Sequence, residues 1–175
     1  MEFRFTDPAS DFSDGLAVLG AYHQSLLAHG EQLMKLAQDI AAQEMCEALA
    51  NRCIALHCYY FHANRLHHLD EEQGLFPLLL DRDPLLNGMM DLLAQDHQEI
   101  EEDWEALSRM LGSPPGITDG REFQRMAAVF EKRQREHLLR EEDDFLPRVA
   151  MLLTDEEKMQ SGARMAKLRN LQQYR

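Results

Sequence analysis

Apolar residues recur at heptad-like spacing along four long segments of this chain, and this period most limits its fold. The segments cover residues 16–37, 46–67, 86–111 and 123–145, and Ala, Leu, Glu, Gln, Met and Arg dominate them. Such a period places the apolar side chains on one face of a helix, and these residue types favour helices. The most β-like run, CYYF at residues 58–61, lies inside a helical pattern. The sequence therefore predicts an all-α protein.

The connections between the four segments differ in strength. DRDP at Asp81–Pro84 and GSPPGITDG at Gly112–Gly120 combine the residues that favour turns. Between the first two segments there is only AQDIAAQEM, residues 37–45, which contains neither Gly nor Pro. Short connections join neighbouring antiparallel helices, so we expect an up-down-up-down four-helix bundle.

The ends of the chain extend this bundle. Residues 1–13 read as an irregular N-terminal arm. Thr154 and Glu157 have the spacing of a capping box, which predicts a short C-terminal helix over about residues 155–173. With a bundle core of about residues 14–150, we interpret residues 1–175 as one domain.

The amino-acid composition limits the classes of binding partner and the cellular compartment that we expect for this protein. The chain has 18 Lys and Arg against 31 Asp and Glu, a net charge of -13. Such a surface repels phosphate groups, which argues against nucleic acid and anionic membranes. No stretch approaches the roughly 20 apolar residues of a membrane span, and the start lacks the apolar core of a secretory signal. An odd number of cysteines (Cys46, Cys53 and Cys58) without CxxC spacing favours reduced thiols in the cytoplasm.

Each apolar stripe carries one histidine where an apolar residue is expected; these are His23, His67, His97 and His137. The second histidine begins the pattern HxxxEExxLFP, and the fourth begins HxxxEExxFLP exactly 70 residues later. The chain therefore consists of two helical hairpins of one design. Each hairpin supplies one lone histidine and one His-x-x-x-Glu pair, with Glu71 in the first and Glu141 in the second.

The four histidines are predicted to lie at one height. In an antiparallel hairpin, residues at equal height are equally far from the turn, and the midpoints between successive histidines are residues 45, 82 and 117. The last two midpoints fall in the strong turn signals. Residues four apart on a helix share a face, with Cβ atoms about 5–6 Å apart. Burying these imidazoles and carboxylates without a counter-charge costs several kcal/mol per ion, so we expect metal ions between them.

Other polar residues near the motif have less specific interpretations. Glu142 is an alternative to Glu141 as the metal carboxylate, and Glu101, four residues after His97, is equally able to reach the site or to face solvent. The remaining histidines are expected on the solvated surface: His29, His57, His62 and His68. A solvated face is also expected for Asp70, Glu99, Glu102 and Asp103. Three aromatic residues are expected in the core or around a gas-sized pocket: Tyr60, Trp104 and Phe130.

The order of a lone histidine, HxxxEExxLFP, a second lone histidine and HxxxEExxFLP resembles the hemerythrin-like HHE cation-binding family over about residues 16–150. The family includes up-down-up-down bundles. The resemblance implies two non-haem iron ions that interact with O2. It implies that the four seam histidines are terminal ligands and that Glu71 and Glu141 bridge the irons. Zinc is a substitute ion, because it also accepts imidazole and carboxylate ligands.

One departure from the family bears on function. Oxygen-carrying hemerythrins have a histidine four residues after the one on the third helix, where this chain has Glu101. A site with fewer nitrogens disfavours simple reversible O2 carriage and favours O2 or iron sensing, storage, or handling of peroxide or nitric oxide. Two alternatives stay open: a di-iron enzyme with peroxidase-like or oxygen-activating chemistry, and a metal-free acidic adaptor. A homodimer, or a complex with another protein, is compatible with each of these functions.

Overall fold

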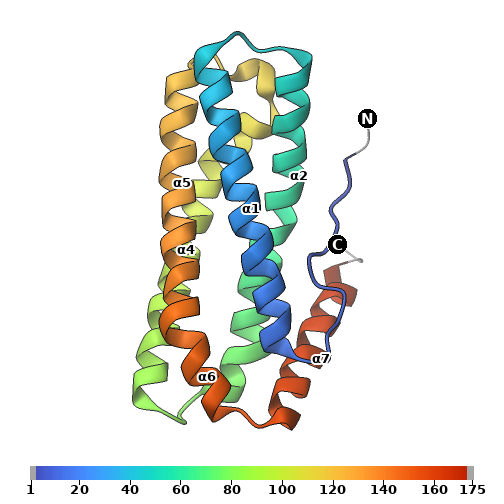
Figure 1. Ribbon diagram of the computed structural model, residues 1–175, viewed down its shortest axis with the longest axis vertical. Coiled ribbons are helices and arrows are strands. Elements are labelled where there is room, and N and C mark those ends of the chain that lie inside the picture. The colour runs from blue at the N-terminus through green and yellow to red at the C-terminus, as the bar shows by residue number, and fades with distance from the viewer. Residues whose placement is uncertain (1–2, 173–175) are drawn as a thin grey trace.

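The computed structural model of the protein describes residues 3–172, and its longest elements are four helices that lie side by side (Figure 1). These helices are α1 (Gly15–Ala42), α2 (Glu47–Leu69), α4 (Pro84–Gly112) and α5 (Gly120–Arg140). Helix α1 packs against α2 and α5, and α4 packs against the same two helices, so the four enclose a common interior. The described residues contain no strand, which confirms the all-α class.

Shorter elements complete the chain. They are a π-helical turn η1 (Asp70–Leu75), α3 (Phe76–Leu79), a 3-10 turn η2 (Pro114–Gly116), a second π-helical turn η3 (Glu141–Phe145), α6 (Leu146–Leu152) and α7 (Asp155–Gln172). Helix α6 continues α5 at the lower end of the bundle in Figure 1, and α7 lies outside it, beside the N-terminal arm.

Side-chain caps fix where three of the long helices begin. Asp14 accepts a hydrogen bond from the backbone N–H of Leu16, and Asp83 and Asp119 cap α4 and α5 in the same way. Such caps satisfy N–H groups that have no partner within the helix. Helix α2 has no side-chain cap, and the sequence preceding it gave the weakest turn signal. The three midpoint residues 45, 82 and 117 all lie in connections between the long helices.

The predictions for the two ends of the chain are confirmed within the described residues. Residues 3–14 contain no helix, and α7 starts directly after Thr154. The backbone N–H of Thr154 donates to Oε2 of Glu157 at 2.9 Å, and the N–H of Glu157 donates to Oγ1 of Thr154 at 3.2 Å. These reciprocal bonds form the capping box. Residues 1–2 and 173, which the predictions also covered, lie outside the described range.

Helix α7 packs closely on the start of α1 and on η1. An added Cβ at Gly15 would lie 2.0 Å from Oγ of Ser161, so a larger residue would separate the two helices. Further along α7, the guanidinium of Arg169 forms a two-pronged ion pair with the carboxylate of Asp70. Asp70 is completely buried. The expectation that Asp70 lies on a solvated face is wrong, because α7 covers it and supplies the counter-charge.

The π-helical turns follow the two histidine motifs and have a local cause. The N–H of Phe76 bonds to the carbonyl of Glu71, five residues earlier, and Leu146 bonds to Glu141 in the same way. The next residues are Pro77 and Pro147, which lack an N–H and clash with the carbonyl four residues earlier in a regular helix. A widened turn relieves that clash. Such single-turn π segments are frequent at functional sites.

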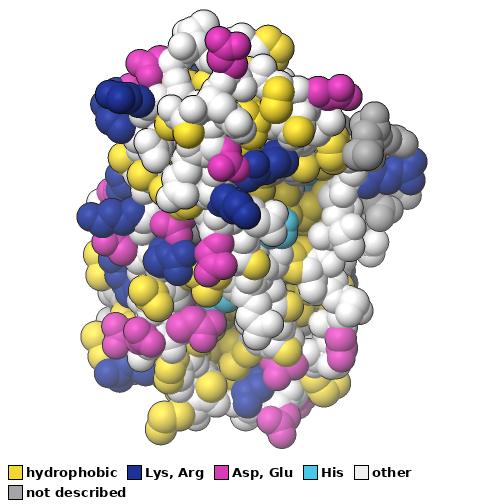
Figure 2. Space-filling model, turned by 45° about the horizontal axis from the view of Figure 1, so that its top comes forward, with side chains coloured by type: hydrophobic (Ala, Val, Ile, Leu, Met, Phe, Trp, Pro, Cys, Tyr) yellow, Lys and Arg dark blue, Asp and Glu magenta, His cyan; other side chains and the backbone are white. Residues whose placement is uncertain are grey.

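On the face of the molecule in Figure 2, acidic and basic side chains are interspersed, without a large patch of Lys and Arg. Among the described residues, no helix is both long and apolar enough to cross a membrane.

Candidate metal centre

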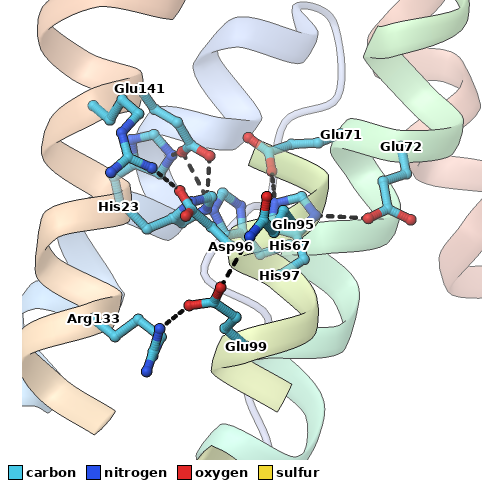
Figure 3. A network of polar contacts seen from close by, with 12 residues as sticks. His23, His67, Glu71, Glu72, Gln95, Asp96, His97, Glu99, Arg133 and Glu141 are labelled. Carbon is cyan, nitrogen blue, oxygen red and sulfur yellow. Dashed lines mark hydrogen bonds and ion pairs between the residues drawn. The ribbon is translucent and has the colours of Figure 1, made fainter. Parts of the chain in front are cut away.

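Six polar side chains meet inside the bundle, between its four long helices. Figure 3 labels all of them except His137. None of them is more than 3% exposed. They are the six residues for which the sequence predicts metal ligation: His23, His67, Glu71, His97, His137 and Glu141. The structure therefore brings together residues from all four helical segments, at the single height that the midpoints predict.

The six side chains form two overlapping groups, each with its ligand atoms within 4.8 Å of one another. One group contains His23 and His67, and the other contains His97 and His137. Glu71 and Glu141 belong to both groups. A carboxylate has two oxygens and can contact two cations, so this arrangement has the form of two adjacent metal positions with two shared carboxylates.

The distances within the groups fit ligands around a cation. Nε2 of His97 lies 2.8 Å from Oε2 of Glu71, and Nε2 of His23 lies 2.7 Å from Oε2 of Glu141. Two ligand atoms about 2.1 Å from one ion, at a right angle, would be about 3 Å apart. The sequence pair His137 and Glu141 has a similar separation, 2.8 Å from Nε2 to Oε1.

These inward-facing atoms make no hydrogen bonds within residues 3–172. Both oxygens of Glu71 and of Glu141 lack such a partner, as do both ring nitrogens of His67 and Nε2 of His23, His97 and His137. Leaving a buried polar group unsatisfied costs about 1–3 kcal/mol, and more if it is charged. Their close nitrogen–oxygen contacts become ion pairs only when the imidazoles are protonated. With neutral imidazoles the lone pairs of nitrogens and carboxylates converge on one another, so the residues present fit a pair of bound cations.

Carboxylates on the outer side orient three of the histidines. Nδ1 of His23 lies 2.5 Å from Oε1 of Glu142, and Nδ1 of His97 lies 2.6 Å from Oε1 of Glu72. With the proton on Nδ1, each N–H donates to a carboxylate and leaves Nε2 free, an arrangement typical of metal-bound histidine. Nδ1 of His137 lies 3.3 Å from Oδ2 of Asp96. The structure thus places Glu142 on the outer side of His23, not in either ligand group.

The electrostatics show how strongly the acids and imidazoles interact. Burial alone would lower the pKa of His97, but its contacts with Glu71 and Glu72 raise that pKa to about 9. Burial opposes charge at His137 as well, yet Glu141 and Asp96 raise its pKa to about 10. Although burial favours the protonated carboxyl, His137 and His23 hold the pKa of Glu141 well below its ordinary value. Positive charge is therefore favoured on His97 and His137, whereas burial lowers the pKa of His67.

The sequence predicts His68 on the solvated surface, and this prediction is wrong. The residue is 4% exposed and lies beside the centre. Its ring stacks on that of His97, with centroids 4.0 Å apart and planes at 14°. One ring nitrogen of His68 lies within 4.8 Å of ligand atoms of His97 and His137. The apolar stripe of α2 does not include this residue, because a stripe marks one face of a helix, whereas a helix in a bundle faces two neighbours.

The other three histidines are only partly buried, and each packs against an aromatic ring, so they are not fully solvated either. They pair as His29 with Tyr59, His57 with Trp104 and His62 with Phe5. Tyr60 and Phe130 are fully buried, with ring centroids 5.2 Å apart, and Trp104 contacts both. The core assignment is confirmed for Tyr60 and Phe130, whereas Trp104 is partly buried and packs against the core.

The acidic residues on α4 differ in their roles. Glu101 is 57% exposed and lies 3.5 Å from Nδ1 of His68, outside both groups that share Glu71 and Glu141. Glu99 and Asp103 pair with Arg133 near the surface, and Figure 3 shows the Glu99 contact below the centre. Glu102 is exposed, as expected.

A groove of about 310 Å³ lies beside the His97 side of the centre, and none of the six candidate ligands lines it. Glu72 and Phe76 form part of its wall, together with Met90 and Asp91. Glu72 contacts the ring of His97, and Phe76 stacks on the same ring at 6.5 Å. A small molecule in this groove would therefore be separated from the centre by one layer of side chains.

Comparison with known proteins identifies a family and one relative. The family model of the hemerythrin HHE cation-binding domain matches residues 14–149. The chain is also 29% identical, over 100 residues, to a protein of Haemophilus influenzae described as uncharacterized. That similarity covers 57% of this chain and 58% of the relative, so the chain matches little more than half of the relative's length.

Proposed function

The chain belongs to the hemerythrin HHE cation-binding family, and from this premise we propose that it holds two iron ions and interacts with O2 or a related small oxidant. The observation that carries the proposal is the sharing of Glu71 and Glu141 between the two groups of buried ligands. A single metal ion would need only one group. Two groups with common carboxylates call for two neighbouring cations.

In this proposal each side chain has a definite task. His23 and His67 would hold one ion, His97 and His137 the other, and Glu71 and Glu141 would contact both. When bound, the irons would supply redox chemistry toward the small oxidant. Imidazole and carboxylate suit iron, and they also accept zinc, which is the substitute we expect if iron is scarce.

The surrounding protein would fix the geometry of this centre. With ions bound, Glu72, Glu142 and Asp96 would hold the protons on the outer nitrogens of His97, His23 and His137 and leave the inner nitrogens to the ions. The completely buried glutamates and the packed aromatic core exclude bulk water from the layer. A small molecule in the groove beside Glu72 would lie next to two side chains that contact His97, Glu72 and Phe76.

We further propose that α1, α2, α4 and α5 act as an antiparallel up-down-up-down bundle and that residues 14–150 are its folding unit. These helices would then position the four histidines, and the π-helical turns that continue α2 and α5 would position Glu71 and Glu141, which favours precise geometry. The free thiols of Cys46, Cys53 and Cys58 support a cytoplasmic location.

Metal analysis with absorption spectroscopy tests the proposal. The purified chain is loaded anaerobically with Fe(II), freed of loosely bound metal on a desalting column, and then exposed to O2, azide or peroxide. We expect two irons per chain and near-ultraviolet bands, typical of a bridged ferric pair, that change on adding these ligands. If the protein binds no metal in stoichiometric amount and its melting temperature is unchanged by chelators, the acidic adaptor is favoured instead.

A catalytic role is the second candidate, and the groove beside Glu72 favours it, because a substrate there would approach the centre. The iron-loaded protein would then turn over peroxide or a reducible substrate faster than the same amount of free iron. Binding of O2 or azide without such turnover would support the binding role alone.

A further inference from the structure

His68 is the one buried histidine near the centre that the family pattern does not use. It follows His67 on α2, and its side chain points toward α4 and α5, where its ring packs against His97 and His137. Neither of its ring nitrogens makes a hydrogen bond within the described part of the chain. An imidazole must always carry at least one N–H, so such burial is unfavourable unless a partner is added.

The surroundings of His68 match those of the other ligand histidines. His23 and His97 each turn Nδ1 toward a glutamate on the outer side. Nδ1 of His68 likewise lies 3.5 Å from Oε1 of Glu101, which a small side-chain rotation would bring into hydrogen-bond range. That orientation leaves Nε2 as the nitrogen available to the centre.

The position of His68 also favours one of the two metal positions. One of its nitrogens lies within 4.8 Å of ligand atoms of His97 and His137, which share the second group. It forms no such group with His23. The parallel stacking of His68 on His97 is compatible with two imidazoles that reach one ion side by side.

We propose that His68 supplies a fifth imidazole to the centre, as a ligand of the ion held by His97 and His137. This inference rests on the proposed two-ion site. The nitrogen that oxygen carriers place four residues after the third-helix histidine would here come from α2, while Glu101 at that place holds the outer side of His68. The two ions would then be unequal, with two imidazoles on one and three on the other.

Replacement of His68 by leucine, which fills similar space without a ligand atom, tests this role. Anaerobic Fe(II) titrations against a competing chelator measure both binding steps, and Mössbauer spectra of ⁵⁷Fe-loaded protein report each iron environment. For His68→Leu we expect one binding step to weaken by at least about tenfold and one of the two iron signals to change. The other step and signal should remain as in the wild type.

Two further variants separate ligation from packing. His68→Ala should lose the same affinity and recover it when free imidazole is added, because imidazole can enter the vacated space. His62→Leu, at a partly buried histidine on the same helix but away from the centre, should bind both irons normally. Circular dichroism verifies that each variant is folded, and His68→Phe, which also lacks a ligand atom, replaces His68→Leu if the latter is not.

The outcomes distinguish this inference from the proposed function. Wild-type protein that holds fewer than two irons would contradict the two-ion site itself. Wild-type protein that holds two, with unchanged titrations and Mössbauer spectra in His68→Leu, would overturn the role of His68 alone and leave it as a packing residue.

Discussion

Nδ1 of His97 on α4 lies 2.6 Å from Oε1 of Glu72, which belongs to the π-helical turn after α2. The same relationship joins His23 on α1 to Glu142 after α5, at 2.5 Å. In each Glu-Glu pair, therefore, the first carboxylate faces the centre and the second holds the lone histidine of the other hairpin. Two adjacent residues perform different tasks because the widened turn directs them to opposite sides of an imidazole.

Substitution of these outer glutamates should weaken metal binding without abolishing it. In Glu72→Gln or Glu142→Gln, the amide is a poorer acceptor than the carboxylate and no longer supports positive charge on the imidazole. We expect iron affinity to fall about 10–100-fold, as measured by chelator competition. Glu102→Gln, at an exposed position on α4, is the control, and an equal loss in that variant would rule out an effect specific to the histidines.

The shared and unshared ligands should behave differently. Glu141→Gln removes an oxygen donor from both groups, so both binding steps should weaken. His67→Ala or His137→Ala should mainly weaken one step and leave the helical content largely intact. Plasma emission spectrometry and circular dichroism check these results, with Glu136→Gln, on the exposed face of α5, as the control. Full iron content in both histidine variants would contradict the ligand assignment.

Removal of the metal should lower thermal stability, because the layer of acids and imidazoles then lacks its counter-charge. A ligand present at about 1,000 times its dissociation constant stabilises the native state by about 4 kcal/mol. For a chain of this size that corresponds to roughly 8–16 °C in Tm. Differential scanning calorimetry of iron-loaded and chelator-treated protein measures the difference, and identical melting curves would indicate that no ion binds the native state.

The ion pair between Arg169 and Asp70 should be essential for the stability of the α7 contact. Arg169→Met keeps the aliphatic packing but leaves a completely buried carboxyl without a partner. Removing one member of a buried pair typically costs about 3–5 kcal/mol. Urea denaturation should show that loss in Arg169→Met and a smaller loss in the double variant with Asp70→Asn. Equal losses in both would mean that packing, not charge, dominates the contact.

Cysteine reactivity should depend on position and pH. Burial raises the pKa of Cys53 to about 11, so its reactive thiolate is scarce at pH 8 and increases only as the pH approaches that value. Cys46 is exposed and should react first with iodoacetamide, as peptide mass spectrometry would show. Rapid labelling of Cys53 at pH 8 in folded protein would mean that α2 opens readily.

The height of the site could be predicted because it depends only on regular geometry. Equal distances from the turns put the four histidines in one layer, and the connections around residues 45, 82 and 117 fall where this requires. The heptad-like stripes likewise gave the core, including Tyr60 and Phe130. Such features follow from the helical period and from short connections between neighbours.

The errors arose where a second surface covers a helix. Asp70 was assigned to solvent because nothing in its own segment opposes its charge, whereas Arg169 reaches it from 99 residues away along the chain. His68 was assigned to solvent because a stripe describes only one face. A regular α-helical period does not predict the π-helical turns, although Pro77 and Pro147 indicate a local change in the helix.

The crossed pairing of His97 with Glu72 and of His23 with Glu142 also sets an order of events during synthesis. The amino-terminal hairpin leaves the ribosome with His23 still without its carboxylate, which arrives more than a hundred residues later. Iron that met the nascent chain early would find an incomplete and loosely oriented set of ligands. Loading of the proposed site would therefore depend on the arrival of the last long helix, because both halves of the chain supply its ligands.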